Sequence, residues 1–121
     1  MKYDVVIIGA GPAGAYCAKN LVEKGLKVLI LDKKKFPRNK ICGGLISSKA
    51  LKLIQENCIK NYINKMRPNP VHKIILTCGQ KDVSLKKNDI LGIIVRREQF
   101  DEAIINMAVD KGANFVDNCE Y

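Results

Sequence analysis

The chain has 121 residues, of which 47% are hydrophobic and 27% charged, with 21 Lys and Arg against 12 Asp and Glu. This length and composition indicate one folded domain and exclude a disordered chain, although the length is small for an enzyme that holds both a dinucleotide and a substrate, which raises the possibility of a fragment. The net charge of +9 suits an anionic cofactor or membrane surface; we expect no nucleic-acid partner, because the lysines are dispersed and no aromatic residues lie among them.

The first predicted elements surround a glycine-rich turn. A run of β-branched residues ending at Ile8 predicts a strand from about Tyr3, and it leads into glycines at positions 9, 11 and 14. Gly9 lets the strand turn sharply, Gly11 lets backbone approach a pyrophosphate, and Gly14 lets helix pack on strand. The N–H groups at the start of the following helix suit a phosphate diester. This spacing predicts a dinucleotide-binding βαβ unit; the alternative is a βαβ unit that only uses tight turns.

The helix is expected from Pro12 to about Lys24, with Gly25 ending it, and the second strand from Lys27 to Leu31. Asp32 follows that strand, where a carboxylate can accept hydrogen bonds from an adenosine ribose. Residues 33–47 contain prolines and glycines with little periodicity. They predict a long ordered loop of the kind that usually carries function.

The middle of the chain predicts a different layer. Ser47 or Ser48 is expected to cap a short helix with an apolar face, and residues 57–70 lose that periodicity. Two prolines near residue 70 mark a crossing into this layer. Strands are then expected over 71–78, 83–85 and 90–95, with a turn at 79–82.

The last predicted elements return to the parallel pattern. Apolar residues at 100, 103, 104, 107 and 108 predict a helix from Arg97 that Gly112 ends, and a strand follows over 113–116. The simplest topology places this strand beside the second one, in the order 3-2-1 of half a Rossmann sheet. We therefore predict an α/β fold, a partial Rossmann-like domain over 1–59 and 96–121, with 60–95 as an inserted antiparallel β layer.

Three stretches together resemble a known family. They are YDVVIIGAGPAGAYCA from residue 3, FPRNKICGG at 36–44 and VRREQFD at 95–101. They look like the N-terminal part of the geranylgeranyl reductase family, FAD-dependent oxidoreductases built like p-hydroxybenzoate hydroxylase. The resemblance covers essentially the whole chain but only the front portion of that family. The second FAD motif of the family and most of its substrate-binding sheet belong to a later section.

The resemblance implies a set of FAD-binding residues. Asp32, where the family more often has Glu, would hold the adenosine ribose, and Arg38 would approach the pyrophosphate or ribose. Arg97 would reach the cofactor from the other side, with Arg96 the less favoured substitute; ordinary surface arginines are the alternative. Lys33 opens a basic block whose position favours cofactor phosphate or membrane lipid over DNA. The resemblance also implies a cradle for the pyrophosphate made of Gly9, Gly11, Pro12, Ala13 and Gly14.

The resemblance places Cys42, Gly43 and Gly44 close to the flavin ring, because two glycines allow backbone to pass against a flat ligand. Cys42 lies near Lys40, which would lower its thiol pKa and let it position substrate or transfer a proton; a buried, inert thiol is the alternative. His72 has no partner at metal-ligand spacing and is interpreted as structural. The four cysteines at 17, 58, 78 and 119 are expected in the core. Five cysteines without CxxC spacing argue against disulfides and zinc.

The function that the resemblance implies is an FAD-dependent oxidoreductase that reduces isoprenoid double bonds in lipid biosynthesis, with NADPH or ferredoxin as electron donor. The substrate would be a prenyl lipid. No stretch reaches the roughly 18 apolar residues that span a bilayer, so we expect a cytoplasmic protein, peripheral on the inner membrane face if it meets a membrane. Two alternatives stay open: an FAD-dependent monooxygenase of the same fold, and a truncated, non-catalytic nucleotide-binding module.

Overall fold

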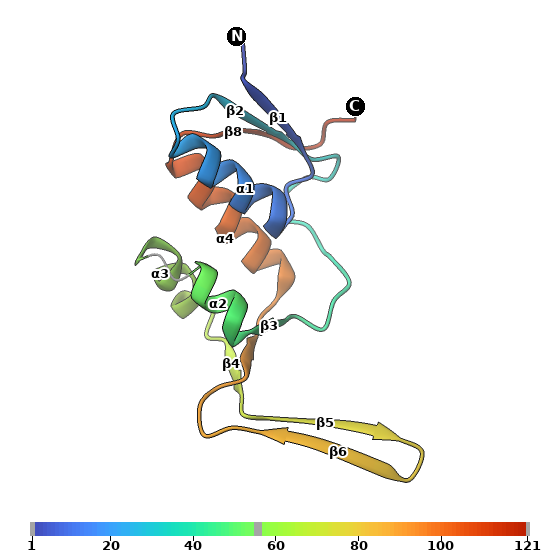
Figure 1. The fold of residues 1–121 in the computed structure, drawn as a ribbon. Helices are drawn as coiled ribbons and strands as arrows, with labels where there is room; N and C mark the ends of the chain where they lie inside the picture. The colour runs from blue at the N-terminus through green and yellow to red at the C-terminus, as the bar shows by residue number, and fades with distance from the viewer. Residues whose placement is uncertain (1, 55–56, 121) are drawn as a thin grey trace. The chain divides into compact units, whose positions relative to one another are not determined.

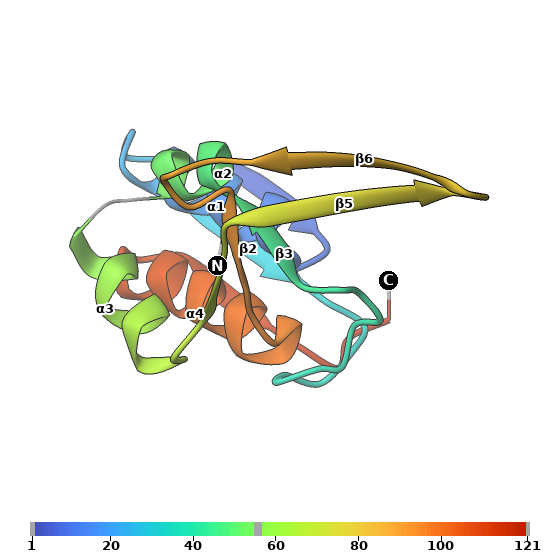
Figure 2. The ribbon, with the colours of Figure 1, turned by 90° about the horizontal axis from the view of Figure 1, so that it is seen from below.

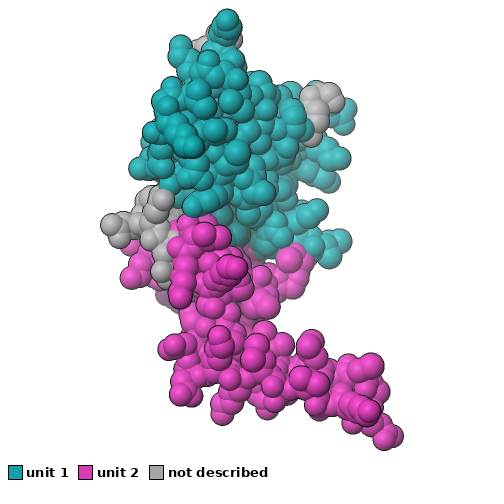
Figure 3. All heavy atoms as spheres, viewed as in Figure 1, with its two compact units in different colours: residues 1–41, 97–121 teal, residues 42–96 magenta. Residues whose placement is uncertain are grey.

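The computed structural model describes residues 2–54 and 57–120, without the side chains of residues 57–59. The chain divides into two compact units (Figure 3). The first unit comprises residues 1–41 and 97–121, and the second unit residues 42–96. Residues 42–59, predicted to be part of the Rossmann-like region, lie in the second unit, where the strand Leu45–Ser47 pairs with the strand Gly92–Ile94.

The first unit contains a parallel sheet of three strands, β1 (Val5–Ile8), β2 (Val28–Leu31) and β8 (Asn114–Val116). β2 lies in the middle, with β1 and β8 on either side. Ile30 of β2 is the register partner of both Ile7 and Phe115. The order 3-2-1 and the parallel direction predicted from the sequence are thereby confirmed.

Two helices, α1 (Pro12–Val22) and α4 (Arg97–Asp110), lie side by side against one face of this sheet (Figure 1). A glycine with positive φ follows the end of each helix, Gly25 at +84° and Gly112 at +111°, a conformation that a residue without a Cβ adopts without strain. The periodic apolar positions of α4 are buried, as expected. The core of this unit consists of Ala10, Ala15, Ala18, Val28, Ile30, Phe100, Ala103, Ile104, Ile105, Met107, Ala108 and Ala113.

The second unit has a small antiparallel sheet in the order β3-β7-β4, made of β3 (Leu45–Ser47), β7 (Gly92–Ile94) and β4 (Asn69–Val71). The helices α2 (Ser48–Ile54) and α3 (Asn57–Lys65) lie between β3 and β4 in the chain. Ser47 is the cap of α2, because its Oγ accepts a hydrogen bond from the Ala50 N–H at 3.2 Å.

A separate two-stranded ribbon completes the second unit: β5 (Lys73–Cys78) pairs antiparallel with β6 (Lys81–Lys86), as Figures 1 and 2 show. The register brings Ile74 opposite Leu85 and Leu76 opposite Val83, so apolar residues collect on one side of the ribbon. That side has little cover: Leu76 is 69% exposed and Val83 68%.

Two elements of the second unit were missed in the sequence. β3 falls inside the predicted loop 33–47, because three residues are too few to display an alternating pattern. α3 falls where the sequence was interpreted as losing periodicity, although Ile59, Tyr62 and Ile63 are spaced for one helix face. Among its described side chains, that of Ile63 is buried. The predicted strand 71–78 is two strands interrupted at His72. No helix in the described ranges has the length and apolarity to cross a bilayer.

Candidate cofactor-binding site

The glycine turn of the first unit has the backbone geometry that its spacing predicts. Gly9 has φ of +101°, and its N–H donates to the Leu31 carbonyl at 2.7 Å, which ties the turn to the end of β2. A Cβ on Gly14 would collide with the Gly9 carbonyl oxygen, so α1 can pack this close to the turn only with glycine there. α1 starts at Pro12, and its N-cap Gly11 provides no side-chain hydrogen bond. The first N–H groups of the helix are therefore left for another acceptor.

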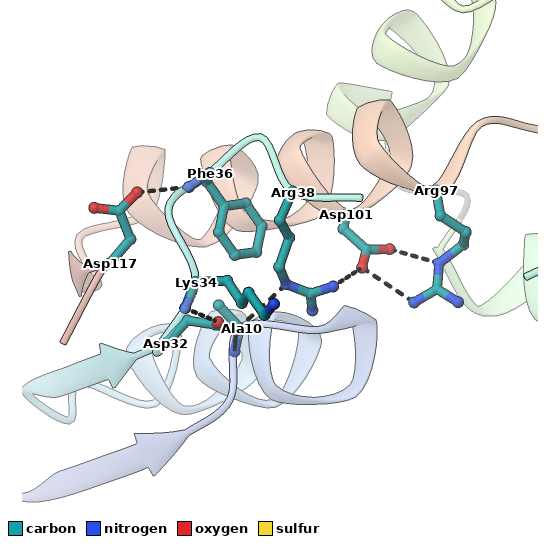
Figure 4. A network of polar contacts seen from close by, with 8 residues as sticks. All are labelled: Ala10, Asp32, Lys34, Phe36, Arg38, Arg97, Asp101 and Asp117. Carbon is teal, nitrogen blue, oxygen red and sulfur yellow. Dashed lines mark hydrogen bonds and ion pairs between the residues drawn. The ribbon is translucent and has the colours of Figure 1, made fainter. Parts of the chain in front are cut away.

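Asp32 lies at the end of β2 and is only 6% exposed. Its two carboxylate oxygens accept different backbone hydrogen bonds: Oδ2 from the Ala10 N–H and Oδ1 from the Lys34 N–H, both at 2.9 Å (Figure 4). Asp32 therefore joins the glycine turn to the start of the following loop. Each oxygen has a second lone pair, so acceptance of a ribose hydroxyl is compatible with this arrangement.

Arg38 turns back from that loop toward the glycine turn. Its Nε lies 3.5 Å from Oδ2 of Asp32, and its Nη1 lies 3.4 Å from Oδ2 of Asp101. The guanidinium carbon is 5.0 Å from the centre of the Phe36 ring, a cation–π distance. Nη2 lies 3.5 Å from the position that a Cβ on Gly11 would occupy. The side chain, 12% exposed, is thus held over the turn and is not an ordinary surface arginine.

Asp101 is a site residue that the sequence reasoning did not single out. It lies in the second turn of α4, where its carboxylate is 0% exposed and is paired with two arginines. Arg97, one helical turn earlier, binds it with two hydrogen bonds, Nε to Oδ1 at 2.8 Å and Nη2 to Oδ2 at 3.0 Å. Figure 4 shows Asp101 between Arg97 and Arg38. The polar residue at a buried helix position was the signal in the sequence, because a buried carboxylate requires cationic partners.

Two further residues fix the loop that carries Arg38. The Phe36 N–H donates to Oδ2 of Asp117 at 2.7 Å, beyond the end of β8. The Phe36 ring meets Phe115 edge to face, with ring centres 5.3 Å apart. The loop is thus attached to the sheet at Phe36, two residues before Arg38. Phe36 opens the FPRNKICGG stretch but was given no role from the sequence, and Asp117 lies in no motif, so the tertiary contacts identify what the two residues do.

A cavity of about 210 Å³ opens beside these groups in the first unit. Exposed lysines line this cavity together with Gly9 and Asp32, so its wall is predominantly cationic. An anionic nucleotide fits this donor set: backbone N–H groups at the start of α1, a fixed guanidinium and a carboxylate for hydroxyl groups. The residues that line the cavity are Gly9, Asp32, Lys33, Lys34, Arg38, Asn39 and Lys40.

The predicted Cys42-Gly43-Gly44 stretch lies in the second unit. Gly44 has φ of +74°, and a Cβ there would collide with the Val95 carbonyl oxygen, so glycine is required. Its N–H donates to Sγ of Cys42 at 3.4 Å. A Cβ on Gly43 would meet nothing within 4 Å. Cys42 is exposed, so the alternative of a buried thiol is wrong.

The expectation that the other cysteines are core residues is also wrong where the structure describes them. Cys17 and Cys78 are exposed and Cys119 is half-buried, because they fall on solvent-facing positions of α1, β5 and the segment after β8. The side chain of Cys58 lies outside the described residues. His72 is exposed and lines a cavity of about 500 Å³ in the second unit. Among the described residues no group of three or more His, Cys, Asp or Glu could hold a metal ion.

Known proteins share this chain's sequence along nearly its whole length. An uncharacterized protein of Methanosarcina barkeri is 39% identical over 117 residues, which are 96% of this chain and 29% of that protein. A digeranylgeranylglycerophospholipid reductase of Picrophilus torridus is 30% identical over 94% of this chain and 29% of its own length. The chain therefore spans less than a third of these relatives.

Solved structures share the fold. A geranylgeranyl bacteriochlorophyll reductase-like protein of Thermoplasma acidophilum superposes with a TM-score of 0.81 over 96% of this chain and 30% of that one, at 22% identity. The flavin-dependent brominase Bmp2 superposes with a TM-score of 0.78 over 94% of this chain and 29% of its own, at 29% identity. The model of the FAD binding domain matches residues 2–120. With the glycine turn, Asp32 and Arg38 in the geometry described above, the chain belongs to the family of FAD-binding domains found in flavin-dependent reductases and halogenases.

Proposed function

We propose that this chain binds FAD through its first unit and forms the cofactor-binding part of an enzyme that reduces isoprenoid double bonds of prenyl lipids. The observation that carries the cofactor part is the position of Arg38: its guanidinium lies at the glycine turn, between the carboxylates of Asp32 and Asp101. A cation fixed beside free helix N–H groups is suited to a diphosphate. The chemical class of the substrate rests on the reductases among the relatives.

In this proposal the residues of the first unit bind and orient the cofactor. The N–H groups at the start of α1 and the Arg38 guanidinium hold the diphosphate, and Asp32 accepts a ribose hydroxyl. Lys33, at the cavity wall, adds positive charge. Bound FAD would supply the redox chemistry, by which two electrons from NADPH or a ferredoxin reach the double bond as a hydride.

Reduction of an alkene also consumes a proton, which an acid must hold near the double bond. We assign this role to the Cys42 thiol, which is exposed and whose Sγ accepts the Gly44 N–H. Replacement of Cys42 by Ala would then slow the reduction while leaving FAD affinity unchanged, whereas replacement by Ser would retain a hydrogen-bonding group but not the acidity of a thiol. Equal rates for all three proteins would remove Cys42 from the reaction.

The net charge of +9 supports a site of action at an anionic membrane face, where prenyl lipids reside. Binding to vesicles that contain anionic lipid, weakened by salt, is the expected behaviour. Equal binding to neutral and anionic vesicles would contradict it.

A second candidate is an FAD-dependent monooxygenase or halogenase, in which reduced flavin activates oxygen. The similarity to the brominase at 29% identity favours this candidate. A third candidate is a nucleotide-binding module without its own catalysis; the match of the FAD binding domain model to residues 2–120 supports cofactor binding and specifies no reaction.

The test begins with the chain of 121 residues mixed with FAD and passed through a desalting column. Flavin absorbance that elutes with the protein is expected, and its absence under every condition of reconstitution would overturn the proposal. The loaded protein is then given NADPH or a reduced ferredoxin and a geranylgeranyl lipid, without oxygen. Gain of hydrogen in the lipid, measured by mass spectrometry, supports the reductase; products that form only with oxygen or halide support the second candidate. FAD binding without either product supports the cofactor-binding role alone.

A further inference from the structure

Asp101 is the most completely buried carboxylate among the described residues, and it lies on the side of α4 that otherwise carries apolar core residues. It is 0% exposed, and it follows Phe100 and precedes Ala103 on the face of α4 that forms the core. A charged group without water is costly unless opposite charges and hydrogen bonds surround it. Its partners within the described ranges are the guanidinium groups of Arg97 and Arg38.

The two arginines relate to Asp101 differently. Arg97 binds it with two hydrogen bonds across one turn of the same helix, so this pair is local and sets the direction of the carboxylate. Arg38 arrives from a loop far away in the sequence, at 3.4 Å from the same Oδ2. A carboxylate that one partner holds firmly can serve as the fixed point for the other.

Each of the three nitrogens of the Arg38 guanidinium has a different neighbour. Nε faces Asp32, Nη1 faces Asp101, and Nη2 lies beside Gly11. Because a guanidinium is planar, two fixed edges determine where the third points. The group that remains for a ligand is therefore Nη2, next to the residue whose missing side chain gives a diphosphate room to approach.

We propose that Asp101 is a positioning residue for diphosphate binding: fixed by Arg97, it holds the Arg38 guanidinium at the glycine turn. The proposal rests on the proposed FAD function and adds to it a role for α4, the helix that carries Asp101 and Arg97. In this proposal Arg97 contributes to diphosphate binding indirectly, because it fixes the Asp101 carboxylate.

The proposal and the effect of charge alone predict opposite changes in anion affinity for Asp101→Asn. The direction of the measured change therefore tests the proposal. Asp101→Asn removes a negative charge close to the site, so an anion should bind more tightly if only the electrostatic potential counts. If Asp101 acts through the direction of Arg38, the anion should bind more weakly. In one of its two orientations the Asn amide points its NH2 group at the guanidinium, donor against donor. Nη1 of Arg38 then loses the acceptor that fixes it.

The probes are FAD, ADP and adenosine, titrated into the full chain by calorimetry or by NMR. For Asp101→Asn we expect FAD and ADP affinity to fall about tenfold, a change that corresponds to ~1.4 kcal/mol, and adenosine affinity to stay unchanged. A general loss of structure would weaken adenosine as well. Asp89→Asn, which removes the same charge from an exposed residue of the second unit, should alter none of the three affinities.

Two further variants keep the proposal falsifiable if Asp101→Asn folds poorly. Asp101→Glu preserves the charge but moves the carboxylate, so ADP affinity should fall although the net charge is the same. In an Arg38→Gln background, Asp101→Glu should cause no additional loss of ADP affinity, because the two residues act as a pair. Unchanged or higher ADP affinity in Asp101→Asn or Asp101→Glu overturns the proposal.

The wild-type chain separates this proposal from the function on which it rests. ADP binding without FAD binding would overturn the FAD function and leave the role of Asp101 to be decided by the variants. FAD binding that is equal in wild type and Asp101→Asn would overturn the role of Asp101 alone. Binding of neither ligand would overturn both.

Discussion

The two units place apolar residues in opposite surroundings. In the first unit the periodic residues of α4 are covered, and Ile104 is 1% exposed. In the second unit the alternating residues of the β5–β6 ribbon form an equally regular apolar side, yet Leu76 remains 69% exposed. Periodicity therefore predicts which residues share a face, but whether that face is buried depends on what packs against it.

The units also differ in how they use polar residues. The first unit contains buried charges that are all paired: Lys19 with Glu23, and the series Asp32, Arg38, Asp101 and Arg97. In the ribbon of the second unit, the polar contact between Thr77 and Asp82 at 2.7 Å is exposed. Buried, paired charges at a glycine turn indicate a site for an anion, whereas exposed pairs contribute little to stability or specificity.

Gly14→Ala is expected to have the largest effect, because the first unit depends on close contact between backbone atoms. The new Cβ would collide with the Gly9 carbonyl oxygen, and neither group can rotate away. We expect a loss of about 3 kcal/mol in the free energy of unfolding, measured by thermal or urea unfolding followed by circular dichroism. Gly43→Ala, where a Cβ meets nothing within 4 Å, should change stability far less. Equal losses in the two variants would contradict this account.

Removal of the same kind of side chain from each unit tests the comparison directly. Ile104→Ala leaves a cavity beneath the sheet of the first unit and should cost at least about 2 kcal/mol. Leu76→Ala removes an exposed side chain from the ribbon and should cost less than about 0.5 kcal/mol. Urea unfolding of both variants measures the difference. A cost for Leu76→Ala as large as that for Ile104→Ala would mean that another molecule covers the ribbon.

Gly11→Ala separates binding from folding within the first unit. The Cβ would lie at an ordinary contact distance, 3.5 Å, from Nη2 of Arg38, so stability should change little. The methyl group occupies the space through which a diphosphate would approach, and FAD affinity should fall about tenfold, or ~1.4 kcal/mol. Fluorescence titration of flavin measures this. Gly79→Asn, at the turn of the ribbon where φ is +60°, adds a side chain that the left-handed region tolerates and should leave FAD affinity unchanged.

The smallest expected effect is the pH dependence of the Glu23 pair. The hydrogen bond from the Lys19 ammonium, at 2.8 Å, and the nearby Lys111 lower the pKa of Glu23 below its ordinary value. A lowered folded-state pKa means that the pair stabilises the fold at neutral pH and that this contribution is lost as the pH falls through the lowered pKa. The melting temperature of Glu23→Gln should therefore be lower than that of wild type at pH 7 and approach it in acid. A difference that does not vary with pH would contradict the assignment.

Much of the first unit could be predicted because its signals are local. The glycines at 9, 11 and 14, the strand that precedes Asp32 and the helix from Arg97 can each be recognised from a few neighbouring residues. The right-handed crossover rule then predicts the strand order. The second unit was predicted less well. β3 is three residues long, too short to display an alternating pattern, whereas α3 has the helical spacing of Ile59, Tyr62 and Ile63 and was overlooked because polar residues surround them.

The sequence by itself determined that a strand, a glycine turn and a helix would form the start of a parallel sheet, because these choices follow from local backbone freedom and periodicity. The resemblance to a known family added Arg38 as a candidate ligand for phosphate. Only the tertiary structure decided how Arg38 is held, since Asp32 and Asp101 come from two elements that are distant along the chain. A buried carboxylate acquires its partners from packing, and no spacing rule within a helix names an arginine more than sixty residues earlier in the chain.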